Sequence, residues 1–407
     1  MKAIILAAGK STRLHPLTVN RSKVMLPIAN RTILEHNLEQ LAATKDIHEA
    51  VIVVGFCSEE IMTKFGSNFG SGNRKIKLAY AFQTEQLGTG HALMQAEKFV
   101  ASDKKFLVIM GDDLCSSTDI KKCISHDSCI LAKKVQNISS FGKVVADKGI
   151  LKKLVEKPDE NGSGLANTGC YVLPNSIFQL LRKLKKSSRG EYEITDAITE
   201  IAKKEKIAVE EAEFWQPITY PWSLLDATEE ILKQREKDKP HISAAATIEK
   251  YATLKGFVAV GKGTLIRNGA YIEGPVVIGE SCIIGPNCFI RPYTSIGNRC
   301  KVGNAVEVKN AILMDGAVIG HLSYCADSVV GKSVNFGAGT ITANLRHDNG
   351  PVKSMVRGEL VSTGRRKFGT IMGDNAKTGI HTSIYPGRKI WPGKTTLPRE
   401  VVREDIV

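Results

Sequence analysis

The chain has 407 residues, of which 43% are hydrophobic and 24% charged, so general disorder is excluded and two or three globular domains are expected. Its formal charge of +14 favours anionic partners, and no apolar run is long enough to span a bilayer. Nine cysteines without a C-x-x-C pair argue against a zinc ribbon or a disulfide framework and favour a cytoplasmic location. The apolar opening, residues 1–8, is too short for a typical signal peptide.

Residues 2–239 alternate short apolar runs with amphipathic stretches. This alternation predicts an α/β domain with a mostly parallel sheet that is covered on both faces. A last helix near residues 227–239 ends before Pro240, where we place the boundary between a domain 1–239 and a domain 240–407. The other expected elements are strands at 3–6, 50–54, 77–81 and 106–110 and helices at 32–43 and 89–100.

A loop with one glycine, Gly9-Lys10-Ser11-Thr12-Arg13, follows the first expected strand. Its backbone N–H groups can surround a phosphate, while Lys10 and Arg13 can neutralise the charge. It is not a Walker A loop, since Ile4 stands where the first glycine should be, and it also lacks the G-x-G-x-x-G pattern. By itself the loop is equally compatible with an ordinary basic turn.

Two carboxylates, Asp112 and Asp113, follow the strand expected at 106–110. Ligands of open α/β folds bind at the carboxyl edge of the sheet, and carboxylates at this edge suit Mg²⁺ on a nucleotide phosphate. A turn or a helix cap is the alternative interpretation of this pair.

Further motifs accompany the loop over residues 1–235: Pro16-Leu17-Thr18, Lys23, Gln83–Gly90, Met110–Leu114, Glu156-Lys157-Pro158, Asn167-Thr168-Gly169, and Trp222 with Asp226. Together with the loop, they resemble the sugar-1-phosphate nucleotidylyltransferases. Two positions depart from that pattern, because Ser11 replaces a usual glycine and Ser22 replaces the proline before the lysine.

The resemblance implies a Rossmann-like nucleotidyltransferase domain in which a sugar-phosphate oxygen attacks the α-phosphorus of a nucleotide and pyrophosphate leaves. It implies that Arg13 and Lys23 are catalytic cations and that Asp112 and Asp226 bind Mg²⁺. It further implies that Gly142, Glu156 and Asn167 bind the sugar phosphate. The residues expected to bind the nucleotide are Leu6, Ala8, Gly9, Gln83, Gly88 and Thr89.

From residue 248, aliphatic side chains recur at every sixth position. The uninterrupted series is Ile248, Leu254, Val260, Ile266, Ile272, Ile278, Ile284, Ile290, Ile296, Val302 and Val308. This repeat is typical of a parallel β-helix, which we expect to be left-handed, with the aliphatic residues inside. The register blurs after Val308 and returns from Ile319. We interpret Cys282, Cys288 and Cys300, which share one inward position, as small core residues and not as metal ligands.

The irregular part of the repeat contains Glu307-Val308-Lys309, His321-Leu322-Ser323-Tyr324, Asn335–Thr340 and Asn344. A histidine beside a tyrosine suggests a general base, although lone histidines are more often structural. In this order, the motifs resemble the acetyltransferase half of the bifunctional glucosamine-1-phosphate acetyltransferase/N-acetylglucosamine-1-phosphate uridyltransferases, in particular their archaeal branch.

That resemblance implies that His321 deprotonates the sugar amine and that the Ala338 N–H stabilises the oxyanion. Lys309, Tyr324, Asn335 and Asn344 would bind the amino sugar phosphate, partly across a subunit boundary, with acetyl-CoA between the β-helices of a homotrimer. Leu345 and Ala326 replace an aromatic residue and a glycine of the family. The basic cluster Arg365-Arg366-Lys367 is either a site for the 3′-phosphate of CoA or a solvated turn.

We therefore expect an enzyme that acetylates glucosamine-1-phosphate and then couples the product to UTP, with Mg²⁺, to give UDP-N-acetylglucosamine. One alternative is a nucleotidylyltransferase, for instance for glucose-1-phosphate and dTTP, whose β-helix serves only assembly. Another is a regulatory subunit without activity. His321 and Tyr324 argue against the first alternative, and Lys23 and Asp112 argue against the second. The sequence contains no recognised nucleic-acid-binding module.

Overall fold

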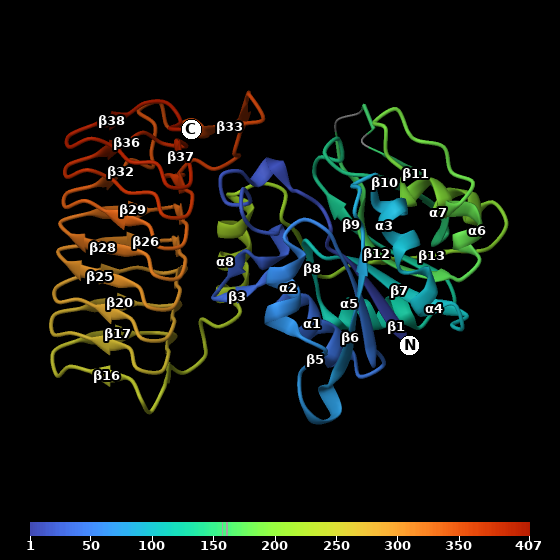
Figure 1. The fold of residues 1–407 in the computed structure, drawn as a ribbon, viewed down its shortest axis with the longest axis horizontal. Helices are drawn as coiled ribbons and strands as arrows, with labels where there is room; N and C mark the ends of the chain where they lie inside the picture. Colours follow the sequence, from blue (N-terminus) through green and yellow to red (C-terminus); the bar gives the residue numbers. More distant parts are fainter. Residues whose placement is uncertain (157, 160–161) are drawn as a thin grey trace. The chain divides into compact units, whose positions relative to one another are not determined.

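The computed structural model describes residues 1–156, 158, 159 and 162–407 (Figure 1). The described residues form two compact units. The first unit comprises Met1–Lys10, Arg21–Met25 and Thr32–Pro217, and the second comprises Ser11–Asn20, Leu26–Arg31 and Ile218–Val407. The second unit thus includes two N-terminal loops, residues 11–20 and 26–31, and the segment 218–239 before Pro240. No helix in the described part of the chain is both long enough and apolar enough to cross a membrane.

The first unit contains a large mixed sheet. Its strands are β1 (Lys2–Leu6), β4 (Glu49–Val54), β5 (Asn68–Phe69), β6 (Ile76–Phe82), β7 (Lys105–Met110), β9 (Cys129–Val135), β10 (Lys143–Asp147), β11 (Ile150–Val155), β12 (Gly164–Pro174) and β13 (Ala208–Glu211). Their order is β10-β11-β13-β9-β12-β7-β1-β4-β6-β5. Strands β7, β1, β4 and β6 are parallel, whereas β12 runs antiparallel between β7 and β9. The predicted mixed, mostly parallel sheet is therefore confirmed at its centre.

Helices pack on both faces of this sheet, which explains why its central strands are almost continuous apolar runs. In β1, Ile4 packs with Leu93 of one helical layer, while Ile5 packs with Leu38 of the other. One layer contains α1 (Ile33–Thr44), α2 (Ser58–Phe65) and α5 (Ser117–Ile124). The other contains α3 (Thr89–Gln95), α4 (Glu97–Val100), α6 (Ile177–Leu181) and α7 (Ile194–Ala202). The helix expected at 89–100 is thus two helices separated at Ala96.

Residues 240–407, all of which the structure describes, form the stacked coils of a β-helix with three parallel sheets (Figure 1). The β15 face contains β15 (His241–Ile242), β18 (Val258–Val260), β21 (Val276–Ile278), β24 (Thr294–Ile296), β27 (Ile312–Leu313), β30 (Val329–Val330), β35 (Ile371–Met372) and β37 (Lys389–Ile390). The β16 face contains β16 (Thr247–Ile248), β19 (Leu265–Ile266), β22 (Ile283–Ile284), β25 (Lys301–Asn304), β28 (Val318–His321) and β31 (Asn335–Phe336). The β17 face contains β17 (Thr253–Lys255), β20 (Tyr271–Glu273), β23 (Phe289–Ile290), β26 (Glu307–Lys309), β29 (Tyr324–Ala326), β32 (Ile341–Thr342), β36 (Ser383–Ile384) and β38 (Val401–Val402).

The predicted inward positions form one continuous core inside the coils. From Val260 onward the aliphatic residues of the series are 0–3% exposed, and Cys282, Cys288 and Cys300 are equally buried. The thiol of Cys282 donates to the Gly297 carbonyl at 3.0 Å. The interpretation of these cysteines as small core residues is confirmed.

The coils shorten where the sequence repeat becomes irregular. Ile284 pairs with Val302, eighteen positions later, but Val302 pairs with Ile319, only seventeen positions later. Each shorter coil lacks one residue at the corner that leads from the β17 face to the β15 face. Asn310 and Asp327 occupy this corner in two successive coils, with φ angles of 42° and 49°.

An insertion separates β32 from the next strand on its face. Thr342 pairs with Ile384, forty-two positions later, because the chain leaves the coil and forms a hairpin of β33 (Lys353–Val356) and β34 (Glu359–Ser362). The second unit also contains helix α8 (Ser223–Lys233). This helix begins and ends earlier than the one expected near residues 227–239.

Candidate functional sites

In the first unit, the carboxyl ends of the parallel strands lie very close together. The Gly111 N–H donates to the Leu6 carbonyl at 2.9 Å. A Cβ atom on Gly55 would lie 2.8 Å from the carbonyl oxygens of both Ala8 and Gln83. The strand ends therefore bring together Leu6, Ala8 and Gln83, which were predicted to bind a nucleotide, while Gly9 follows them as an exposed residue.

The predicted base-reading residues form a compact group at the start of α3. Gln83 is 3% exposed, and its Nε2 donates to the Gly88 carbonyl at 3.1 Å and contacts His91 Nδ1 at 3.1 Å. Gly88 has a φ of 103° and packs so closely that a Cβ would lie 2.7 Å from the Tyr192 carbonyl. Only glycine fits this position without strain. Thr89 is the first residue of α3.

The two carboxylates after β7 have different partners. Asp112 accepts a hydrogen bond from Lys23 Nζ at 2.5 Å, and the Lys23 side chain is 9% exposed. Asp113 belongs to the ladder of β8 (Asp113–Cys115) and β14 (Trp215–Pro217), where its carboxylate accepts from Trp215 Nε1 at 3.1 Å. Asp113 is thus engaged in local structure, whereas Asp112 faces one of the predicted catalytic cations.

The three residues predicted to bind the sugar phosphate also lie together. The Asn167 N–H donates to the Gly142 carbonyl at 2.7 Å. A Cβ on Gly142 would lie 3.2 Å from Glu156 Oε2. Glu156 forms an ion pair with Arg189 at 3.3 Å, and the next residue of its motif, Lys157, lies outside the described residues.

The loop that carries Arg13 belongs to the second unit. The two residues that depart from the family pattern, Ser11 in this loop and Ser22 in the first unit, have visible structural consequences. Arg13 is exposed. Ser11 adopts a left-handed φ of 51°, a conformation that costs a residue with a side chain about 1 kcal/mol and explains why glycine is usual. In the first unit, Ser22 is fully buried, and its Oγ has no hydrogen-bond partner among the described residues.

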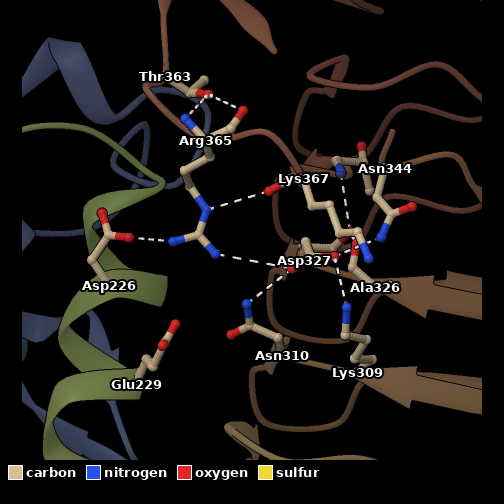
Figure 2. Close-up of polar contacts among 12 residues, drawn as sticks. Asp226, Glu229, Lys309, Asn310, Ala326, Asp327, Asn344, Thr363, Arg365 and Lys367 are labelled. Atoms are coloured by element: carbon tan, nitrogen blue, oxygen red, sulfur yellow. Dashed lines mark hydrogen bonds and ion pairs between the residues drawn. The ribbon is translucent and has the colours of Figure 1, made fainter. Parts of the chain in front are cut away.

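Asp226, the second predicted metal ligand, lies in α8 and accepts a hydrogen bond from Arg365 Nη1 (Figure 2). Burial raises the pKa of Asp226 above its ordinary value, and Arg365 opposes this shift. The Arg365 side chain is 15% exposed and also donates to the Lys367 carbonyl. These contacts hold Arg365 inside the second unit, so its side chain is not part of a solvated turn. Arg366 and Lys367 are exposed.

Three of the predicted amino-sugar-phosphate ligands converge at the end of the β17 face. Asn344 Nδ2 lies 3.5 Å from the Tyr324 hydroxyl and 2.5 Å from Asp327 Oδ2, and Lys309 Nζ lies 3.9 Å from the same Asp327 oxygen. Burial lowers the pKa of Lys309; Asp327 opposes this shift, while Lys367 adds to it. The sequence motifs did not point to Asp327; the signal for it in the sequence is the shortened coil around it.

His321, Asn335 and Ala338 belong to the neighbouring β16 face and its corner. His321 ends β28 and is exposed, and Asn335 is exposed on β31. The Gly339 N–H donates to the His321 carbonyl at 3.2 Å, so His321 and Ala338 lie at the same corner of successive coils. Ala338 is partly exposed at this corner, and its carbonyl accepts from the His381 N–H at 2.7 Å.

Comparison with known proteins matches the two halves of the chain to separate family models. A nucleotidyl transferase family model matches residues 2–234, and a GMPPB C-terminal domain model matches residues 272–406. A solved UDP-glucose pyrophosphorylase in complex with UDP-glucose is 26% identical, with a TM-score of 0.52, and the match covers 57% of this chain and 99% of that one.

Two archaeal relatives match the chain over its full length. "Bifunctional protein GlmU" of Methanococcus vannielii is 40% identical, over 100% of this chain and 96% of the relative. The "bifunctional sugar-1-phosphate nucleotidylyltransferase/acetyltransferase" of Sulfurisphaera tokodaii is 37% identical, over 100% of this chain and 98% of the relative. The chain therefore belongs to the nucleotidyl transferase family and, within it, to the bifunctional sugar-1-phosphate nucleotidylyltransferase/acetyltransferases.

Proposed function

We propose that the protein catalyses two successive steps of UDP-N-acetylglucosamine synthesis. It transfers the acetyl group of acetyl-CoA to glucosamine-1-phosphate, and then the uridylyl group of UTP to N-acetylglucosamine-1-phosphate, with release of pyrophosphate. The convergence of Lys309, Tyr324 and Asn344 around the buried carboxylate of Asp327 carries this proposal. A β-helix that served only assembly would have no need to hold a partly buried lysine at such a place, because burying a cation is costly.

In uridylyl transfer, the residues of the first unit mainly bind and orient the reactants. Gln83 and Gly88 receive the base, and Glu156 and Asn167 hold the sugar so that its phosphate oxygen lies in line with the α-phosphorus. Lys23 is already close to the phosphate site through Asp112. When substrate binds, its ammonium neutralises charge that develops on the phosphate oxygens.

Of the two predicted metal ligands, Asp112 is the one whose surroundings fit Mg²⁺. Asp112 is a partly exposed carboxylate at the carboxyl end of β7, and Mg²⁺ is usually held by one or two carboxylates together with substrate phosphates. One oxygen of Asp226 is occupied by Arg365, which leaves its other oxygen for a metal. The described residues contain no group of three or more potential His, Cys, Asp or Glu ligands. A bound Mg²⁺ would neutralise charge on the phosphate oxygens.

In acetyl transfer, the amine of the substrate attacks the thioester carbonyl carbon. His321 accepts the proton that the amine loses, and the Ala338 N–H donates to the oxyanion that forms on the carbonyl oxygen. The C–S bond then breaks, and the thiolate of CoA leaves and takes up a proton. Lys309, Tyr324 and Asn344 hold the phosphate and hydroxyl groups of the substrate during this step.

We also propose that the active protein is a cytoplasmic homotrimer. Asn335 lies on the β16 face, whereas Lys309, Tyr324 and Asn344 lie at the end of the β17 face. Residues on two faces of a prism can complete one site when a second prism packs against them. This arrangement supports a shared site with acetyl-CoA between neighbouring subunits.

One set of assays tests the proposal against both alternatives. Purified protein is given acetyl-CoA with glucosamine-1-phosphate or galactosamine-1-phosphate, and free thiol is measured. Pyrophosphate release is measured with N-acetylglucosamine-1-phosphate or glucose-1-phosphate and with UTP or dTTP. Thiol release and pyrophosphate release together support the proposal. Pyrophosphate release without any thiol release would leave only a nucleotidylyltransferase, and neither signal would indicate a regulatory subunit.

A further inference from the structure

The carboxylate of Asp327 is buried beside the acetyl-transfer residues. Its side chain is only 3% exposed, at the corner between the β17 and β15 faces. A buried carboxylate is costly unless hydrogen bonds and positive charges compensate it. Such groups surround Asp327 among the described residues: Asn344 Nδ2 at 2.5 Å, Asn310 Nδ2 at 2.9 Å, and Lys309 Nζ and Arg365 Nη2 at 3.9 Å each (Figure 2).

The two oxygens of this carboxylate serve different neighbours. Oδ2 faces Asn344 and Lys309, which are proposed to hold the amino sugar phosphate. Oδ1 faces Asn310 and Arg365, which are not. Asn310 is itself buried in the preceding coil, and Arg365 is held by Asp226. One oxygen is thus anchored in the fold while the other contacts the proposed ligands of the substrate.

The charges around Lys309 indicate what its contact with Asp327 does. Lys309 lies among other cations, since the charges of Lys367 and Arg291 both act to lower its pKa. Asp327 is the carboxylate that favours the charged form of the Lys309 ammonium in this surrounding. Arg291 pairs with Glu307 and Arg365 with Asp226, so Lys309 and Lys367 against Asp327 leave one excess positive charge, which suits a phosphate group.

We propose that Asp327 is a positioning residue of the acetyl-transfer site, which orients the Lys309 ammonium and the Asn344 amide toward the amino sugar phosphate without contacting the substrate. This inference rests on the proposed acetyltransferase function. A positioning role in substrate binding affects KM more than kcat, because His321 and the Ala338 N–H, which act on the reacting atoms, lie on another face.

The test compares Asp327→Asn with the wild-type protein in steady-state acetylation of glucosamine-1-phosphate. The substitution keeps the shape but removes the charge and forces neighbouring amides to reorient. Loss of a charge-assisted contact should raise KM for the amino sugar phosphate by about tenfold or more, with kcat changed by less than about threefold. In a double-mutant cycle with Lys309→Met, the two effects should be strongly non-additive.

Asp315→Asn is the matched control. Asp315 is also a corner carboxylate of the β-helix, where Oδ1 accepts from the Asn298 N–H at 2.8 Å and the other oxygen lies 4.0 Å from Arg299, and neither partner is a proposed acetyl-transfer residue. This variant should leave the KM for the amino sugar phosphate unchanged. If Asp327→Asn does not fold, Asn310→Ala, which removes only the anchor of Oδ1, should raise KM by a smaller factor.

The outcomes separate the inference from the proposed function. If the wild-type protein transfers no acetyl group, the proposed function fails. If the wild-type protein is active and neither Asp327→Asn nor Asn310→Ala changes KM, Asp327 is not a positioning residue and the proposed function stands. Equal KM increases in Asp315→Asn and Asp327→Asn, or additive effects of Asp327→Asn and Lys309→Met, would also overturn the inference.

Discussion

Lys23 pairs with Asp112 in the free protein and is proposed to interact with phosphate in the complex. The Lys23 side chain is 9% exposed, so its charge needs a partner when no phosphate is present, and Asp112 provides one at 2.5 Å. Because Asp112 is itself partly exposed, the pair can open toward a ligand. The same carboxylate is therefore suited to pair with lysine in the free protein and to contact a metal in the complex.

The roles proposed for Asp112 and His321 should be separable by mutation. Asp112→Ala should reduce pyrophosphate release by about 100-fold or more, since it removes a group that organises the phosphate site, and should spare acetylation. His321→Ala should reduce acetylation by about 100-fold or more and should spare pyrophosphate release. Both activities are measured on the same preparations, with circular dichroism as the control for folding. Loss of both activities in either folded variant would contradict the division into two sites.

The strands of the β-helix are short, so its stability depends on the column of side chains inside it. Ile284 is fully buried, between Ile266 in the coil before it and Val302 in the coil after it. Each inward residue thus contacts equivalent residues in two neighbouring coils. A cavity at one level affects the packing of both neighbours, because protein interiors are closely packed.

Ile284→Ala should destabilise the β-helix by about 2–5 kcal/mol, the usual cost of such a truncation in a core. The matched control is Ile283→Ala, since Ile283 is the neighbouring residue on the outward side and is 37% exposed. This control should change stability by less than about 1 kcal/mol. Urea denaturation followed by circular dichroism measures both variants. Equal destabilisation by the two changes would show that the inward column does not dominate stability.

The loop that carries Arg13 is held within the second unit by contacts with the last coils and the hairpin. Lys389 Nζ donates to the His15 carbonyl at 3.0 Å, and Arg357 Nε donates to Thr12 Oγ1 at 2.8 Å. Burial lowers the pKa of Lys389 to about 8; Asp405 opposes the shift and Arg388 adds to it. The lysine is only 4% exposed, so its charge carries a desolvation cost at neutral pH.

This lowered pKa predicts a dependence of stability on pH. Between pH 8 and about 10.4, the ordinary pKa of lysine, the unfolded chain binds more protons at Lys389 than the folded chain does. The free energy of unfolding attributable to Lys389 should therefore rise with pH across this window, by up to about 3 kcal/mol. Urea midpoints of the wild-type protein and Lys389→Met are compared from pH 7 to 10.5. A constant difference between the two proteins would refute the lowered pKa.

The distribution of acetyl-transfer residues over two faces has a consequence for assembly. If the site is completed between subunits, the active form is a trimer, and dilution below its dissociation constant should lower acetylation per chain. Multi-angle light scattering gives the mass, and acetylation is measured over the same concentration range. Pyrophosphate release should depend less on concentration, since none of the residues proposed for that site lies on an outer face of the β-helix. A monomer with full acetyltransferase activity would exclude the shared site.

Local spacing in the sequence was sufficient to predict the β-helix core and the central parallel strands. In the β-helix, each inward residue follows the previous inward residue at a fixed distance along the chain. The six-residue series from Val260 to Val308 is buried as expected. The boundaries were less predictable. Helix α8 begins at Ser223, four residues before the expected start, and groups with the second unit, because packing between distant segments decides where a compact unit ends.

Motifs in the sequence also grouped residues that the fold places side by side, such as Gly142, Glu156 and Asn167. They did not show the role of Asp327 or the partner of Asp226. Both depend on Arg365, which reaches them only because the insertion after β32 folds back against the coils. The sequence by itself thus determined the fold of each half and nominated the candidate residues of each site. Only the tertiary structure decided how the buried charges pair, because these pairs join segments far apart in the chain.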